Sequence, residues 1–157
     1  MILRRGTGEV IVHGPITEEF EDVFQRGYNF AYDLAERGEY PLPDLSSHDL
    51  YIACSVLGSP DTPIGGDSFG LLLALVLACR FAQQPLRTDW AFTGAIDNDG
   101  NVLPVGGIEV KREGAARLGY KGIALPSTQL DFFCTSIDQI PVTTAYEAWA
   151  VLTYGQE

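Results

Sequence analysis

An unbroken apolar segment from Phe69 to Cys79 is the feature that most restricts how this chain can fold. Wound as an α-helix, a segment without polar residues is apolar on every side, so other parts of the protein have to surround it. The segment is much too short to cross the hydrocarbon core of a bilayer. We therefore expect a buried helix and no membrane-spanning segment.

The rest of the chain predicts one domain around that helix. With 157 residues, 46% of them hydrophobic and 20% charged, the chain can bury a core without help from metals or disulfides. No repeat, low-complexity tract or linker divides it. Strand-like alternation and helix-like periodicity both occur, which predicts a single α+β domain over residues 1–157.

The expected elements follow from this periodicity and from clusters of Gly, Pro and Asp. In chain order they are a strand at 8–13, an amphipathic helix at 15–38 that Thr17 can cap, a strand at 48–56, an ordered loop at 58–67, the buried helix, a hairpin of 90–96 and 102–103 about a turn at 97–100, a helix at 108–118, a strand at 122–125 and a helix near 146–153.

The charge of the chain bears on its partners. A formal net charge of −11 disfavours nucleic acid, because such a surface repels phosphate. The acidity fits either simple solubility or a preference for basic substrates. No apolar run follows the positive residues at the start of the chain, so we expect no signal peptide. We expect a cytoplasmic protein without membrane contact.

No metal or cofactor is expected. Cys54, Cys79 and Cys134 lie in apolar contexts without metal-ligand spacing, and we expect them to be core residues of a protein in a reducing compartment. Neither His13 nor His48 has a ligand-like neighbour. A phosphate-binding loop of the Gly-x-x-x-x-Gly-Lys-Ser/Thr type does not occur, so this chain alone is not expected to hydrolyse ATP.

Ser68 stands at the entrance to the buried helix, directly after Gly65, Gly66 and Asp67. Two interpretations are open. Ser68 or Asp67 can cap the helix through its side chain. Alternatively, Ser68 is a nucleophile, and the outward-pointing backbone N–H groups at the positive helix end stabilise an oxyanion beside it.

Lys111 falls on the side of a predicted helix that should face the core. At 100° per residue it shares one arc with Ile108, Ala115 and Leu118, and the opposite side carries Glu109, Glu113 and Arg117. Its stem can pack on apolar surface while the ammonium reaches water. Alternatively, burial lowers its pKa and makes it a base that can take a proton from a serine.

Other catalytic patterns are weaker. Asp97 and Asp99 are expected to be turn residues rather than a carboxylate pair with Glu109. Both histidines precede Ser68, and no Gly-x-Ser-x-Gly elbow occurs.

Several short motifs together resemble the proteolytic domain of Lon proteases. They are Gly66-Asp-Ser-Phe-Gly70, Thr93-Gly94, Leu103-Pro-Val-Gly-Gly107 with Lys111, Ala115-Ala116, and the Gly-Ile-Ala-Leu-Pro segment that ends at Pro126. The order of the segments upstream of Gly65 follows the family as well.

The resemblance implies a fold, an activity and a set of site residues. The fold would be that of the Lon proteolytic domain, which is similar to ribosomal protein S5 domain 2. Ser68 would be the nucleophile, Lys111 the general base and Thr93 the residue that orients the lysine. Backbone amides of Asp67 and Ser68 would form the oxyanion hole. The activity would be that of a serine endopeptidase.

The resemblance also bears on partners. The substrate would be a protein or peptide, the chain would form a homo-oligomer, with a ring as one form, and cleavage by this chain would not need ATP. A separate ATPase or adaptor would supply any unfolding. A catalytically silent or partner-activated interaction module remains the alternative.

Overall fold

The computed structural model describes residues 1–54, 61 and 64–154. In chain order its elements are β1 (Ile2–Arg5), β2 (Val10–His13), α1 (Phe20–Glu36), β3 (His48–Ala53), α2 (Gly70–Ala82), β4 (Trp90–Phe92), β5 (Ala95–Ile96), β6 (Val102–Leu103), α3 (Ile108–Arg117), β7 (Gly122–Pro126), the short 3-10 helix η1 (Ser127–Gln129), β8 (Asp138–Val142) and α4 (Ala145–Tyr154). The mixture of helices and sheets confirms the α+β class.

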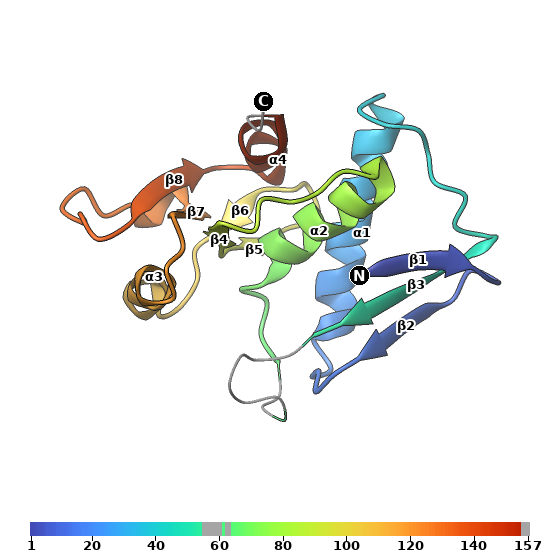
Figure 1. Cartoon of the computed structure of the whole chain (residues 1–157), viewed down its shortest axis with the longest axis horizontal. Helices are drawn as coiled ribbons and strands as arrows, with labels where there is room; N and C mark the ends of the chain where they lie inside the picture. Colours follow the sequence, from blue (N-terminus) through green and yellow to red (C-terminus); the bar gives the residue numbers. More distant parts are fainter. Residues whose placement is uncertain (55–60, 62–63, 155–157) are drawn as a thin grey trace.

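Helices α1 and α2 lie between two groups of strands (Figure 1). The sheet on one side has the order β1-β3-β2, with β1 antiparallel and β2 parallel to β3. On the other side, β4, β7 and β8 form a parallel sheet in that order, and β5 and β6 form a separate antiparallel hairpin. Parallel strands are buried by helices on their faces, and here α3 and α4 contact β7 and β8 respectively.

The two central helices touch at a glycine. A Cβ atom on Gly27 of α1 would lie 3.3 Å from the Cα and N atoms of Ala74 and from a methyl group of Leu77, both in α2. Such close backbone approach lets the helices share one core, which includes residues of β3, β7, β8 and α4. The predicted buried helix is confirmed, and Leu72 is its one exposed large apolar side chain.

The amphipathic helix is confirmed as α1, but its predicted cap is wrong. Phe20, Val23 and Leu34 are buried as expected. The helix begins at Phe20, and Thr17 makes no side-chain cap: its hydroxyl donates to the carboxylate of Glu19. Thr17 lies two residues before the actual N-cap, Glu19, and helix boundaries are the part of an element that periodicity determines least.

The predicted hairpin is correct only in its second half. The 90–96 segment is not one strand, because it breaks at Thr93-Gly94: β4 pairs with β7, and only β5 returns to β6. Asp97 is confirmed as a turn residue, since its Oδ1 accepts the N–H groups of Asp99 and Asn101, each at 2.9 Å.

Other predictions are confirmed in part. The predicted strand at 48–56 is β3, which ends at Ala53; its predicted end at Val56 and much of the predicted loop at 58–67 lie outside the described residues. Cys79 is buried, whereas Cys54 and Cys134 are half-buried, so the core assignment holds fully for Cys79 alone. Among the described residues, no helix has the length and apolar character needed to cross a bilayer.

The contact at Gly27 yields a stability prediction. Gly27→Val should lower the free energy of unfolding by about 1–3 kcal/mol, the usual cost of overpacking, because the backbone of Ala74 cannot retreat as a side chain can. Urea unfolding followed by circular dichroism measures the change. In the matched control Gln25→Val, at an exposed position of α1, the change should stay within about 0.5 kcal/mol. Equal losses in the two variants would contradict the close contact.

Candidate active site

The segment before α2 holds Ser68 without using it as a cap. The N-cap position of α2 is Phe69, which makes no side-chain cap hydrogen bond, and the first turn is closed by the Gly70 N–H donating to the Asp67 carbonyl at 2.9 Å. The Ser68 side chain is half-buried, and the Asp67 side chain is exposed. The structure therefore does not support the capping interpretation of Ser68.

Ser68 is tied by its backbone to the break in the 90–96 segment. The Gly94 N–H donates to the Ser68 carbonyl at 3.0 Å, and the Gly94 carbonyl accepts the N–H of Leu71 at 2.9 Å. Position 94 needs a glycine, because a Cβ atom there would lie only 2.7 Å from a methyl group of Val102. The strand break thus fixes the start of α2 relative to the second group of strands.

Thr93 precedes this contact and is buried. Its N–H donates to the Ala124 carbonyl of β7 at 3.0 Å, so its backbone belongs to the edge of the parallel sheet. Thr93 is thus hydrogen-bonded to the sheet, and Gly94, the next residue, is hydrogen-bonded to Ser68.

Lys111 lies in α3, and the start of that helix depends on a glycine. Gly107, the N-cap residue, has φ 65° and ψ 31°, a left-handed conformation that L side chains rarely adopt. Its carbonyl accepts the Lys111 N–H at 3.0 Å. The helix begins at Ile108, and this sets the direction in which Lys111 leaves the backbone.

The surroundings of Lys111 change its basicity. Burial lowers the pKa of its half-buried ammonium below the usual lysine value, and the negative charge of Asp67 opposes this effect. Lys111 is half-buried, so both interpretations of the sequence, a packed stem and a base of lowered pKa, fit its position.

Backbone hydrogen bonds connect Ser68 with the Thr93-Gly94 break, but the three predicted side chains are not joined to one another. Among the described residues, no hydrogen bond connects the side chains of Ser68, Lys111 and Thr93. In the same part of the chain, the N–H groups of Asp67 and Ser68 donate to no other group. Such contacts commonly tighten only when substrate binds, and two free amides at a helix entrance can receive an oxyanion.

One buried polar residue of this region was not expected from the sequence. Arg112, next to Lys111, is 6% exposed, whereas Leu118, which was predicted to share the buried arc, is 61% exposed. The helix ends at Arg117, so Leu118 is already leaving it. The spacing of Ile108, Arg112 and Ala115 contains the missed signal, since residues four and three apart lie on one helix face.

Two cavities among the described residues lie away from the predicted site. One of about 1010 Å³ is lined by the start of β1, the end of α2 and residues 41–44, and another of about 680 Å³ lies between α1, α4 and the 98–100 turn. Neither is lined by Ser68, Lys111 or Thr93. Within the described ranges, no group of three or more His, Cys, Asp and Glu side chains is arranged to hold a metal ion.

Comparison with known proteins identifies the family of the chain. Residues 2–146 match the family described as the Lon protease (S16) C-terminal proteolytic domain. The chain is 36% identical over 120 residues to the archaeal Lon protease of Methanocaldococcus jannaschii, covering 73% of this chain and 18% of that protein. It is 33% identical over 123 residues to Lon protease 1 of Thermus thermophilus, covering 77% of this chain and 15% of that protein.

A third relative, the Lon protease of Desulfatibacillum aliphaticivorans, is 30% identical over 125 residues, which cover 79% of this chain and 15% of that protein. The chain thus spans less than a fifth of the length of these relatives. With a family match over nearly its whole length, the chain belongs to the family of Lon protease (S16) C-terminal proteolytic domains.

Proposed function

We propose that this chain is a serine endopeptidase that hydrolyses peptide bonds of proteins or peptides through Ser68 and Lys111, without ATP. Membership of the Lon proteolytic-domain family supports a serine-type protease. The observation that carries the assignment is the geometry at the entrance to α2: Ser68 is half-buried and makes no cap, and the N–H groups of Asp67 and Ser68 beside it are free. The lowered pKa of the half-buried Lys111 fits the role of base.

The proposed reaction is acyl transfer to water. Neutral Lys111 takes the proton of the Ser68 hydroxyl, and the Ser68 oxygen attacks the peptide carbonyl carbon. The free amides of Asp67 and Ser68 stabilise the resulting oxyanion. Lys111 then gives its proton to the leaving amine, and a water activated by the same lysine releases the acyl group from Ser68. The Thr93 hydroxyl holds Lys111 in place.

The proposal extends to the setting of the chain. We take residues 1–157 as one domain with a fold similar to ribosomal protein S5 domain 2. The chain would act in the cytoplasm as a homo-oligomer, with a ring as one form. A separate ATPase or adaptor would deliver folded substrates.

Removing either member of the dyad should abolish cleavage. Ser68→Ala and Lys111→Met should each lower kcat/KM by about 10⁴-fold or more, the scale seen when a catalytic nucleophile or base is lost. Cleavage of a mixed peptide library without ATP, read by mass spectrometry, measures the loss. Both variants should unfold at or above the wild-type temperature, because neither removes a hydrogen bond and Lys111→Met removes a half-buried charge.

Three outcomes would contradict the proposal in different ways. Cleavage that survives Ser68→Ala would point to another nucleophile, and Cys134 would be tested next, because the hydrogen bond between its sulfur and the Ser136 hydroxyl lowers the pKa of its thiol. No cleavage by the assembled wild type would favour a silent module. Cleavage only after an ATPase is added would favour a partner-activated one.

The pH dependence should report on Lys111. The base must be neutral, so kcat/KM should rise as pH passes the Lys111 pKa, below the usual lysine range. Asp67 stabilises the charged ammonium and raises this pKa. Asp67→Asn should therefore move the rising limb to lower pH, as measured by a pH–rate profile.

The control for this profile is Glu109→Gln, on the exposed side of the same helix. It changes the net charge by the same amount as Asp67→Asn, and its limb should stay where the wild-type limb lies. The pairing of Asp67 with Lys111 would be contradicted if Asp67→Asn left the rising limb of the pH–rate profile in place. It would also be contradicted if both variants moved this limb equally.

Two substitutions separate the role of the Thr93 hydroxyl from that of the volume of its side chain. Thr93→Val keeps the shape of the side chain but removes the hydroxyl, and should lower kcat by about ten- to a hundredfold, the scale of a misplaced catalytic group. Thr93→Ser keeps the hydroxyl and should retain most of the activity in the same peptide assay. The opposite order would mean that Thr93 only fills space.

A further inference from the structure

Arg112 is a buried cation beside the proposed catalytic base. Its side chain is only 6% exposed, although it lies in a ten-residue helix at the edge of the molecule. Removing a guanidinium from water is costly unless its N–H groups find acceptors. The position therefore needs an explanation beyond filling space.

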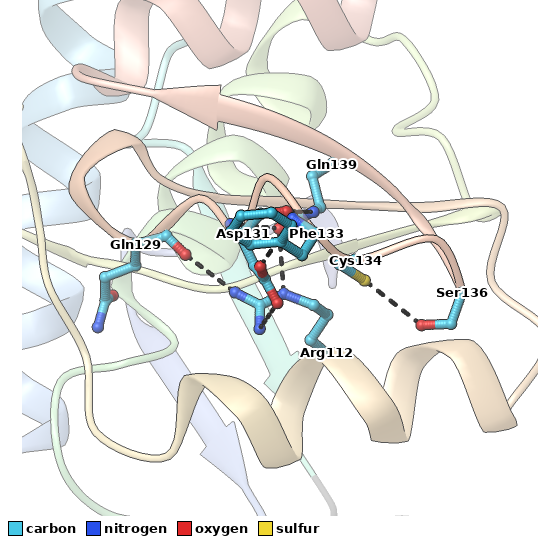
Figure 2. A network of polar contacts seen from close by, with 7 residues as sticks. All are labelled: Arg112, Gln129, Asp131, Phe133, Cys134, Ser136 and Gln139. Atoms are coloured by element: carbon cyan, nitrogen blue, oxygen red, sulfur yellow. Dashed lines mark hydrogen bonds and ion pairs between the residues drawn. The ribbon is translucent and has the colours of Figure 1, made fainter.

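Acceptors surround the guanidinium on three sides (Figure 2). Its Nε donates to Gln139 Oε1 at 3.0 Å, one terminal nitrogen donates to the Gln129 carbonyl at 2.9 Å, and the other lies 3.8 Å from the carboxylate of Asp131. These partners belong to β8, η1 and the segment between them. These contacts thus join α3 to the residues that follow β7 in the chain.

Gln139 in turn fixes the segment that carries Asp131. Its Oε1 accepts the Asp131 N–H at 3.1 Å, and its Nε2 donates to the Asp131 carbonyl at 2.8 Å. The amide side chain therefore holds Arg112 and the backbone of Asp131 at once. A guanidinium and an amide joined in this way have little rotational freedom.

A second clamp holds the chain just before α3. The side chain of Gln129 brackets Val105: its Oε1 accepts the Val105 N–H at 3.0 Å, and its Nε2 donates to the Val105 carbonyl at 2.8 Å. Gln129 contacts Val105 through its side chain and Arg112 through its backbone. Lys111 lies between these two attachment points along the chain.

Apolar packing alone fixes this helix weakly. Besides Arg112, Ala115 is its one fully buried residue, and Ile108 is half-buried. A helix that buries only small side chains can rotate about its own axis with little loss of packing. A rotation of 100° replaces each residue on the buried face by its neighbour in the sequence. The polar clamps therefore supply orientation that the apolar face does not.

We propose that Arg112, Gln129 and Gln139 are positioning residues that set the rotation of α3 and so keep Lys111 directed toward the Asp67–Ser68 segment. The inference rests on the proposed role of Lys111 as the base. None of the three needs to touch substrate; they act through the helix. The half-burial of Lys111 is what the clamps maintain.

Two substitutions test the clamps without altering any charge. Gln129→Leu releases Val105, and Gln139→Leu releases the Nε of Arg112 together with Asp131. Each should lower kcat by about tenfold or more, because a small displacement of a catalytic group is costly, and should leave KM within about twofold of wild type. The matched control is Gln25→Leu on the exposed side of α1, which should leave both constants at the wild-type values.

A second readout follows Lys111 itself, without substrate. The chain contains two lysines, Lys111 and Lys121, so ¹³Cε-lysine labelling gives two signals that a Lys121→Arg sample assigns. In both clamp variants the titration midpoint of Lys111 should move up, toward the usual lysine value, because the ammonium gains solvent. Lys121 serves as the internal reference.

The outcomes separate the two proposals. Folded clamp variants with wild-type kcat and wild-type Lys111 titration would overturn positioning and leave the network a purely structural role. A Lys111 midpoint that moves while kcat does not would overturn its link to catalysis. If the wild type itself cleaves nothing, the proposed function fails, while the Lys111 titration still tests whether the clamps hold the helix. Far-ultraviolet circular dichroism verifies folding of each variant.

Discussion

The contact of α1 with α2 is the constraint on which the rest of the structure depends. An apolar helix needs cover on all sides, and α1 supplies part of it by approaching to backbone contact at Gly27. The remaining cover comes from both groups of strands and from α4, which is bound to α1 where the Tyr146 hydroxyl donates to Asp33 at 2.7 Å. Each group of strands thus has its place because it completes the burial of the same two helices.

Much of this arrangement could be predicted from local patterns. The apolar run, the amphipathic period of α1 and the short run of β7 all follow from the sequence, because burial determines which residue types stand there. The break at Thr93-Gly94 could not, because it depends on the pairing of β4 with β7, a partner distant along the chain. The cap at Thr17 could not be predicted either, because α1 begins at Phe20 with Glu19 as its N-cap, and periodicity does not fix a helix boundary to the residue.

The candidate site also combines residues that local patterns predict with residues that depend on distant partners. Lys111 could be singled out because a lysine on a core-facing arc conflicts with the pattern around it, and conflicts of this kind are expected at functional sites. Arg112 was missed, although its spacing from Ile108 and Ala115 places it on the same face, because its acceptors lie in segments that the sequence does not connect with α3. Buried polar groups follow from tertiary partners, and these are the least local part of a fold.

The division of the site between two parts of the chain has a consequence for newly made copies. Ser68 stands between the first sheet and α2, whereas Lys111 belongs to a helix packed against β7, and the Thr93–Ala124 hydrogen bond that joins the two regions needs β7 in place. During synthesis from the N-terminus, Ser68 is made before Lys111 and before β7. With the dyad proposed above, a nascent or half-unfolded copy has the nucleophile without its base, and such a copy cannot digest its neighbours.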